Sequence, residues 1–151
     1  YTSQYVFPRL LFRYGEGRSL RYVYNQALKS SLVVLIGMAL LGPIFLFITG
    51  YVINNYMPLY TESIPLMKIF YFAAIFASAN LVEVVTIASN KTILIFIENG
   101  LVAFIAFVLF VSSFQSLIWY AYTVLIIQII KFLLSLMNGY AISNNFLQKE
   151  E

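Results

Sequence analysis

The chain has 151 residues, of which 62% are hydrophobic, 18% are aromatic and only 10% are charged. Ordinary globular domains are about half apolar and about a quarter charged. A water-soluble domain of this composition would expose apolar patches far larger than monomers tolerate, so its surroundings must be largely lipid. The composition therefore predicts an integral membrane protein.

The sequence contains no His, Cys or Asp. These absences exclude metal sites built from His or Cys, thiol nucleophiles, Ser-His-Asp triads and Asp-rich metal-nucleotide sites. We therefore expect no enzyme activity, no catalytic or metal-binding residue and no cofactor. A membrane enzyme such as a polymerase or an acyltransferase would need an acid-base constellation that the sequence does not offer.

The N-terminal region, residues 1–30, is predicted to differ from the rest of the chain. Residues 1–7 are expected to be the tail of a preceding membrane helix, which would make the chain a fragment. The stretch 8–29 holds five of the nine basic residues and is predicted to be a polar linker, broken by Gly15-Glu16-Gly17. Residues 19–30 have apolar residues at helical spacing, which predicts an amphipathic helix that lies against headgroups or leads into the next span.

Four apolar segments follow the linker, and each is long enough to cross a membrane. The first, 32–50, would be about 28 Å long as a helix, close to the roughly 30 Å of the hydrocarbon core. The other three are 64–89, 92–112 and 117–142. Because short turns join these three, they are expected to be antiparallel neighbours. The predicted fold class is all-α, a polytopic membrane helix bundle with four complete transmembrane helices at 31–142 and a tail at 143–151.

The first span contains Gly42-Pro43. Proline lacks the amide hydrogen and its ring clashes with the preceding turn, so the helix should bend there. We expect Gly37 and Gly42 to be points of close packing, and Gly42 and Pro43 to be the better candidates for a hinge.

The distribution of Lys and Arg predicts the orientation. Seven of the nine basic residues precede the first span, lie in the turn at Lys91 or lie in the tail, whereas the loops 51–63 and 112–116 hold none. Cytoplasmic loops carry the excess of Lys and Arg in membrane proteins. Both ends of the segment are therefore expected on the cytoplasmic side.

Polar and ionisable side chains inside the spans are the candidate functional residues, because a charge at the bilayer centre costs at least a few kcal/mol unless it faces protein, water or a counter-charge. Lys131 lies near the middle of the last span, and Gln128, Ser135 and Asn138 share its helical face. This polar stripe is either a helix contact held by hydrogen bonds or the lining of a substrate path. For Lys131 we favour the path.

Two glutamates are predicted about 9 Å inside the cytoplasmic side, Glu83 on the second span and Glu98 on the third. Asn80 shares the helical face of Glu83. Glu83 is either a structural partner of Lys131 or a cation or proton site, and we expect it to pair with Lys131 when no substrate is bound. Glu98 is expected to be structural or to snorkel, and Lys68 should reach the headgroups.

Four arginines, Arg9, Arg13, Arg18 and Arg21, precede the first span. Topology alone selects basic residues at such a position, and anionic lipids of the leaflet attract them. The alternative is that these arginines contact a lipid headgroup or the pyrophosphate of a lipid-linked substrate.

The order of several short motifs carries a family resemblance. Phe7-Pro8-Arg9-Leu10 precedes the basic stretch and the span with Gly42-Pro43, and Tyr60 closes a loop before Ile64, Leu66 and Ile69. Three further spans complete the chain. This order resembles the C-terminal part of the polysaccharide-biosynthesis branch of the multidrug/oligosaccharidyl-lipid/polysaccharide exporter superfamily, the Wzx-type lipid-linked oligosaccharide flippases, over nearly the whole chain.

The resemblance implies part of a two-lobe transporter in the bacterial inner membrane, which exports cell-surface polysaccharide such as lipopolysaccharide O-antigen. It implies alternating access between the lobes and a central cationic cavity for an anionic lipid-pyrophosphate sugar, to which Lys131 would contribute. The expected partners are a lipid-linked oligosaccharide, membrane lipids and the missing N-terminal helices of the same protein, and not nucleic acid. The alternative function is a non-catalytic membrane structural or assembly subunit, in which the polar stripes pair helices.

Overall fold

A computed structural model describes residues 2–112 and 116–145, so parts of the predicted turn at 112–116 and tail at 143–151 lie outside it. Its elements are α1 (Thr2–Gly15), α2 (Leu20–Tyr56), the 3-10 helix η1 (Pro58–Ser63), α3 (Ile64–Ala79), α4 (Glu83–Ala88), α5 (Thr92–Ser112) and α6 (Leu117–Asn145). Within the described residues, four stretches are long and apolar enough to cross a membrane: Leu20–Tyr56, Pro58–Ala88, Thr92–Val111 and Leu117–Asn144. The predicted all-α bundle with four membrane-spanning segments is confirmed.

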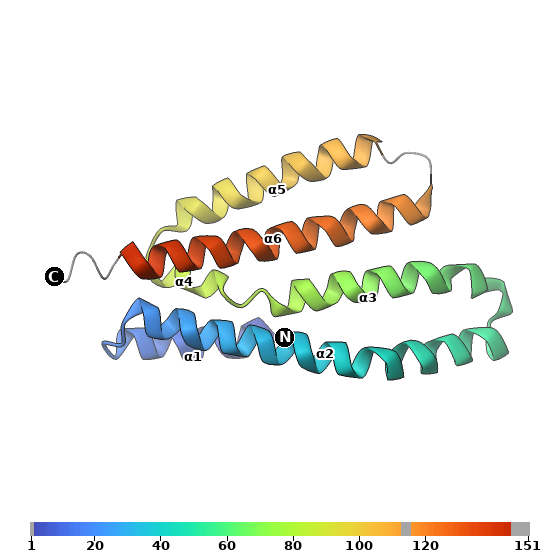
Figure 1. Cartoon of the computed structure of the whole chain (residues 1–151), viewed down its shortest axis with the longest axis horizontal. Helices are drawn as coiled ribbons and strands as arrows, with labels where there is room; N and C mark the ends of the chain where they lie inside the picture. The colour runs from blue at the N-terminus through green and yellow to red at the C-terminus, as the bar shows by residue number, and fades with distance from the viewer. Residues whose placement is uncertain (1, 113–115, 146–151) are drawn as a thin grey trace.

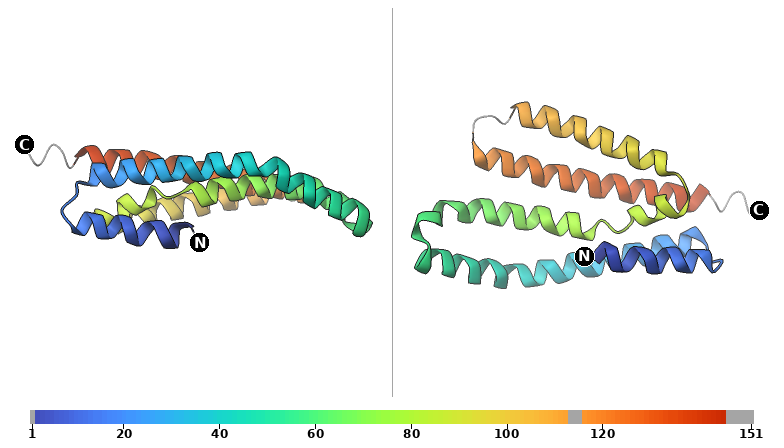
Figure 2. Two further views of the ribbon diagram at one scale, coloured as in Figure 1. Left: turned by 90° about the horizontal axis from the view of Figure 1, so that it is seen from below. Right: turned by 180° about the vertical axis from the view of Figure 1, so that it is seen from behind.

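The long helices lie side by side in the order α2, α3, α6 and α5 (Figure 1). Helix α3 packs against both α2 and α6, whereas α5 packs mainly against α6. The short turn at 89–91 predicts that the second and third spans are neighbours, but they meet mainly through the short helix α4, because α6 occupies the place beside α3. Helix α1 contacts α2 and α4 and lies on one face of this layer (Figure 2).

The N-terminal region is more helical than the sequence predicts. Helix α1 continues through Pro8 as far as Gly15, and the helix stops at the predicted break, Gly15-Glu16-Gly17. Pro8 is the seventh of the 14 residues of α1, so it removes one backbone hydrogen bond from the middle of this helix. Whether residues 1–7 end a longer membrane helix stays a prediction.

A tight turn joins α1 to α2. Gly17 has a φ of 87°, a conformation that glycine adopts without the clash that a Cβ would cause. Ser19 then caps α2, because its Oγ accepts a hydrogen bond from the amide of Tyr22 at 3.3 Å. The predicted amphipathic helix at 19–30 leads directly into the first span, and the two form one helix of 37 residues.

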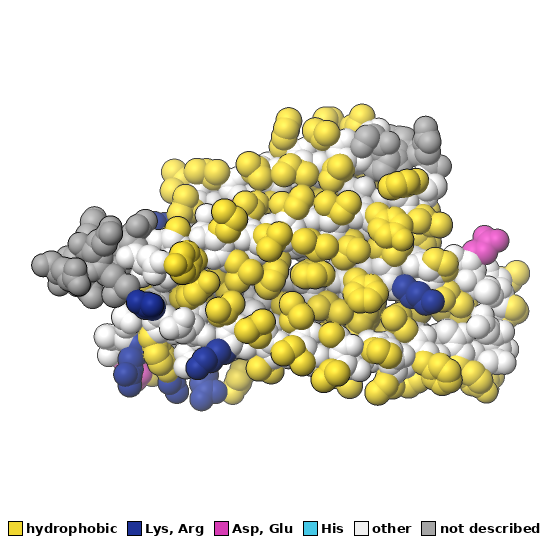
Figure 3. Space-filling model, in the orientation of Figure 1, with side chains coloured by type: hydrophobic (Ala, Val, Ile, Leu, Met, Phe, Trp, Pro, Cys, Tyr) yellow, Lys and Arg dark blue, Asp and Glu magenta, His cyan; other side chains and the backbone are white. Residues whose placement is uncertain are grey.

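The main buried core lies at the end of the bundle that holds this turn, which we call the basic end. Apolar side chains of α1, α2, α4, α6 and the segment before α4 form one cluster there. Its members are Leu10, Leu20, Val23, Ala27, Val82, Val84, Val85 and Ile142. Figure 3 shows basic side chains gathered at the same end and hydrophobic side chains over the middle of the molecule. The apolar face of 19–30 is therefore covered by protein, whereas the exposed apolar surface of the middle suits contact with lipid.

Helix α2 bends in its second half (Figure 2), where Gly42 and Pro43 lie. A Cβ at Gly42 would be 2.7 Å from Cε1 of Tyr71, so glycine is what allows this ring to approach. The Tyr71 hydroxyl also donates a hydrogen bond to the carbonyl of Met38 at 2.5 Å. Gly42 is thus a point of close packing as predicted, whereas a Cβ at Gly37 would meet no described residue within 4 Å, so Gly37 packs against none of these helices.

The orientation can be tested at two exposed asparagines at opposite ends of the bundle, Asn55 near the end of α2 and Asn90 in the turn before α5. We expect a cysteine at Asn55 to react with a membrane-impermeant thiol reagent added to intact cells. A cysteine at Asn90 should react only after permeabilisation, because the basic end is expected inside. The unsubstituted chain has no cysteine, so its labelling measures the background reaction. Reaction at Asn90 alone would invert the orientation.

Candidate functional site

The second membrane-spanning segment is not one helix but two. Helix α3 ends at Ala79 and α4 begins at Glu83. Asn80 has φ −76° and ψ 64°, the values of an inverse γ-turn, and the amide of Leu81 donates to the carbonyl of Ala79 at 2.8 Å. The prediction of a continuous helix at 64–89 is therefore wrong at this point.

Residue types and burial explain the break in this segment. Val82 is β-branched and favours the helix less than leucine or alanine does. Irregular backbone at membrane depth is tolerated where protein covers it. Leu81 is 1% exposed and Val82 is fully buried, so this condition is met.

The break separates two residues that the sequence places on one helical face. Asn80 lies in the break and Glu83 begins α4, so their predicted common face is wrong. Glu83 is half-buried and lies in the first turn of α4, where the helix dipole favours a carboxylate. The side-chain oxygen Oδ1 of Asn80 is buried and has no hydrogen-bond partner among the described residues.

Glu98 on α5 makes the most extensive polar contact of the site. Its side chain is only 7% exposed, and its two carboxylate oxygens accept hydrogen bonds from α6. Ser135 Oγ donates to Oε1 at 2.6 Å and Asn138 Nδ2 donates to Oε2 at 3.0 Å. Hydrogen bonds to a carboxylate are about twice as strong as those between neutral groups. Glu98 therefore joins α5 to α6, in agreement with the structural role expected for it.

The polar stripe of α6 divides into two parts. Ser135 is 1% exposed and Asn138 is half-buried, and both side chains donate hydrogen bonds to Glu98. These two residues therefore fit the interpretation of the stripe as a helix contact. Gln128 and Lys131 are half-buried as well. The side chain of neither residue makes a hydrogen bond or an ion pair with any residue of 2–112 or 116–145.

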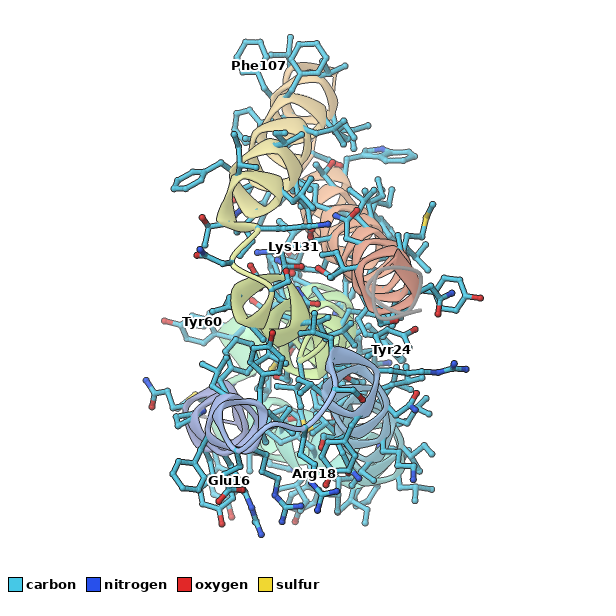
Figure 4. The ribbon with its side chains drawn as sticks, turned by 90° about the vertical axis from the view of Figure 1, so that its left-hand side faces the viewer. Glu16, Arg18, Tyr24, Tyr60, Phe107 and Lys131 are labelled. Atoms are coloured by element: carbon cyan, nitrogen blue, oxygen red, sulfur yellow. The ribbon has the colours of Figure 1, made fainter. Side chains whose placement is uncertain are left out.

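Lys131 lies at the centre of its helix, with 14 residues from Leu117 to it and 14 more to Asn145. At 1.5 Å per residue, it is about 21 Å from each end of α6. Figure 4 shows Lys131 in the middle of the molecule, beside α6 and between α5 and α4. Helix α4 contacts α6, but the expected ion pair between Lys131 and Glu83 is absent from the described part of the chain.

Gly139, which the sequence analysis does not single out, brings α6 against the break. A Cβ on Gly139 would lie 2.5 Å from Cγ1 of Val82 and 3.2 Å from Cδ2 of Tyr24. Ser135, Gly139 and Ser143 follow one another at four-residue intervals, and all three are buried. Small residues at this spacing are typical of close contacts between membrane helices, so the pattern could have revealed this contact.

The four arginines do not act as one group. Arg9 and Arg13 line a cavity of about 300 Å³ between α1 and α2. The guanidinium carbon of Arg18 lies 5.5 Å from the centroid of the Tyr22 ring, within the range of a cation–π contact. Arg21 is exposed and is not part of the cavity lining.

Lys68 is exposed, and its contact with headgroups stays a prediction. It lies in a second, mainly apolar cavity of about 490 Å³ between α2 and α3, which also borders the bend at Gly42 and Pro43. Among the described residues no group of three or more His, Cys, Asp or Glu side chains could hold a metal ion.

Comparisons with models of protein families, with curated protein sequences and with solved structures found no match for this chain. Fold and composition define it as an all-α, multi-pass membrane protein. The resemblance to the flippases stays a prediction.

Proposed function

We propose that this chain is part of a transporter that moves a lipid-linked oligosaccharide from the cytoplasmic to the outer leaflet of a bacterial inner membrane, for export of cell-surface polysaccharide. Lys131 carries the proposal, as a half-buried cation at the centre of a spanning helix that has no carboxylate partner among the described residues. A charge at this depth needs a counter-charge or water. The pyrophosphate of a lipid carrier would supply the counter-charge during transport.

Two features of the backbone support the proposal. Discontinuous membrane helices recur in transporters, and the second span is interrupted at Asn80–Val82, where Val82 lies against Gly139 of α6. The bend at Pro43 gives α2 a position at which its two halves can change their angle. Translocation makes and breaks no covalent bond, so it needs no catalytic residue. The N-terminal helices of the same protein would form the other lobe and complete the path.

Replacing Lys131 tests this function. We expect Lys131→Met to lower transport at least about tenfold, because a loss of about 1.4 kcal/mol of attraction for the pyrophosphate already has that effect. The measurement is the amount of lipid-linked saccharide that becomes accessible at the outer leaflet, normalised to inserted protein. Lys68→Met removes the same charge from an exposed position and should leave transport unchanged. Normal transport by Lys131→Met would reduce Lys131 to a structural residue.

The hydrogen bonds of Glu98 favour a second candidate, a non-catalytic structural or assembly subunit of the membrane. Ser135 and Asn138, half of the polar stripe, bind a neighbouring helix rather than line an open path. If this pairing were the whole role of the stripe, Lys131→Met would change the amount of assembled protein and not the transport per molecule. The normalised assay therefore separates the two candidates.

A further inference from the structure

We propose that the cavity between α1 and α2 binds the phosphate group of an anionic phospholipid in the leaflet at the basic end. The cavity measures about 300 Å³, the lower end of the range typical of ligand pockets. Its polar lining consists of Arg9, Arg13, Tyr22, Gln26 and Ser30, and its apolar lining consists of Tyr5, Val6 and Leu10. This site does not depend on the proposed transport function, because it shares no residue with the polar stripe of α6.

The lining residues converge because of their spacing on two antiparallel helices. Tyr22, Gln26 and Ser30 follow one another at intervals of four on α2, and Arg9 and Arg13 have the same interval on α1. Residues at this interval share one helical face. The tight turn at Gly17 directs the two faces toward each other, so that each helix supplies one wall of the cavity.

The charges of the lining suit an anion. It contains two guanidinium groups and no carboxylate. Arg13 Nη1 donates a hydrogen bond to the Tyr22 hydroxyl at 2.7 Å, which holds this half-buried guanidinium at the cavity wall. Its remaining N–H groups and those of Arg9 can form the paired hydrogen bonds that phosphate oxygens accept, and Gln26 and Ser30 add neutral donors.

The position of the cavity favours a lipid over a soluble phosphate. The first uncharged apolar segment of α2 begins at Leu32, two residues after Ser30, so the cavity wall ends where the hydrocarbon core is expected to begin. Tyr5 is 72% exposed and Val33 is 71% exposed, which leaves apolar surface next to the cavity for acyl chains. A phosphate held by Arg9 and Arg13 would therefore lie at headgroup level.

Lipid titration of the full purified chain tests the site. Native mass spectrometry would count bound phosphatidylglycerol, with phosphatidylcholine and inorganic phosphate titrated in parallel. We expect one phosphatidylglycerol to bind most tightly, and Arg9→Gln with Arg13→Gln to weaken its binding about 30-fold, as the loss of hydrogen bonds from two guanidinium groups to the phosphate predicts. Arg13→Lys keeps the positive charge but lacks the planar guanidinium group, so it should lose less affinity for the lipid than Arg13→Gln. Circular dichroism would verify that each variant is folded.

Arg21→Gln and Arg13→Gln form the matched pair, because each removes one positive charge from the same end of the bundle. Arg13→Gln should weaken the binding of phosphatidylglycerol about fivefold, because it removes hydrogen bonds to the phosphate. Arg21→Gln should weaken this binding less than about twofold. Equal losses in the two variants would show diffuse surface attraction and overturn the site. Equally tight binding of phosphatidylcholine, or displacement of the lipid by inorganic phosphate at matched concentration, would overturn the assignment to an anionic lipid.

Discussion

Replacing both donors of the Glu98 contact, with Ser135→Ala and Asn138→Leu, should lower the free energy of unfolding by about 3 kcal/mol, because the carboxylate would stay buried without a partner. Removing the charge as well, with Glu98→Leu in the same protein, should recover most of this loss. The recovery distinguishes an unpaired buried charge from a simple packing defect, which a third substitution would only deepen. Unfolding in mixed micelles measures all three free energies.

Ser143→Ala is the control for the comparison of the double and triple variants. Ser143 is also buried on α6, at 2% exposure, but its hydroxyl donates to the carbonyl of Tyr140 in its own helix. Loss of this hydrogen bond should lower the free energy of unfolding by less than about 1 kcal/mol, because it involves no other helix and no charge. A triple variant that is less stable than the double variant would contradict the role assigned to the Glu98 contact.

Gly139→Ala should lower the free energy of unfolding by about 1–3 kcal/mol, the usual cost of overpacking a tight contact. The new Cβ would lie 2.5 Å from Val82, which is fully buried and belongs to the irregular backbone between α3 and α4. On its other side Tyr24 packs edge to face on Tyr140, with ring centroids 6.2 Å apart. Neither neighbour can move away without disturbing a further contact.

Gly37→Ala provides the matched comparison, since a Cβ there meets nothing within 4 Å. Alanine is the better helix former by about 1 kcal/mol, so Gly37→Ala should be neutral or slightly stabilising. The same unfolding measurement compares the two variants. Equal stabilities for Gly139→Ala and Gly37→Ala would show that α6 does not press against the break.

Composition and hydropathy predict the membrane-spanning segments well because they report transfer into lipid, a property of each segment alone. The third span is predicted at 92–112 and α5 occupies those residues. The position of Gly42 beside Pro43 likewise predicts close packing at a bend, because proline and glycine constrain the backbone locally. Such features need no knowledge of neighbouring helices.

Features that depend on neighbours could not be predicted in this way. All spanning helices are similarly apolar, so hydropathy cannot show that α6 lies between α3 and α5. The break at Asn80 contains neither glycine nor proline, and it persists because other helices cover Leu81 and Val82. The polar stripe at Ser135 and Asn138 could be predicted as one helical face, but its partner Glu98 follows only from the packing of α5 on α6.

The unbroken length of α2 has a mechanical consequence. Its 37 residues would extend about 55 Å, nearly twice the hydrocarbon thickness. If Gly42 and Pro43 act as the predicted hinge, the part from Leu20 to Gly42 would be an arm of about 34 Å. A change of about 10° at this hinge would displace the far tip by about 6 Å, more than one helical turn. The turn at Gly17 and the Arg13–Tyr22 hydrogen bond join α1 to that end of α2, and both helices share one buried core with α4 and α6. A change of angle at Pro43 would therefore have to move the arginines at the membrane surface together with this core.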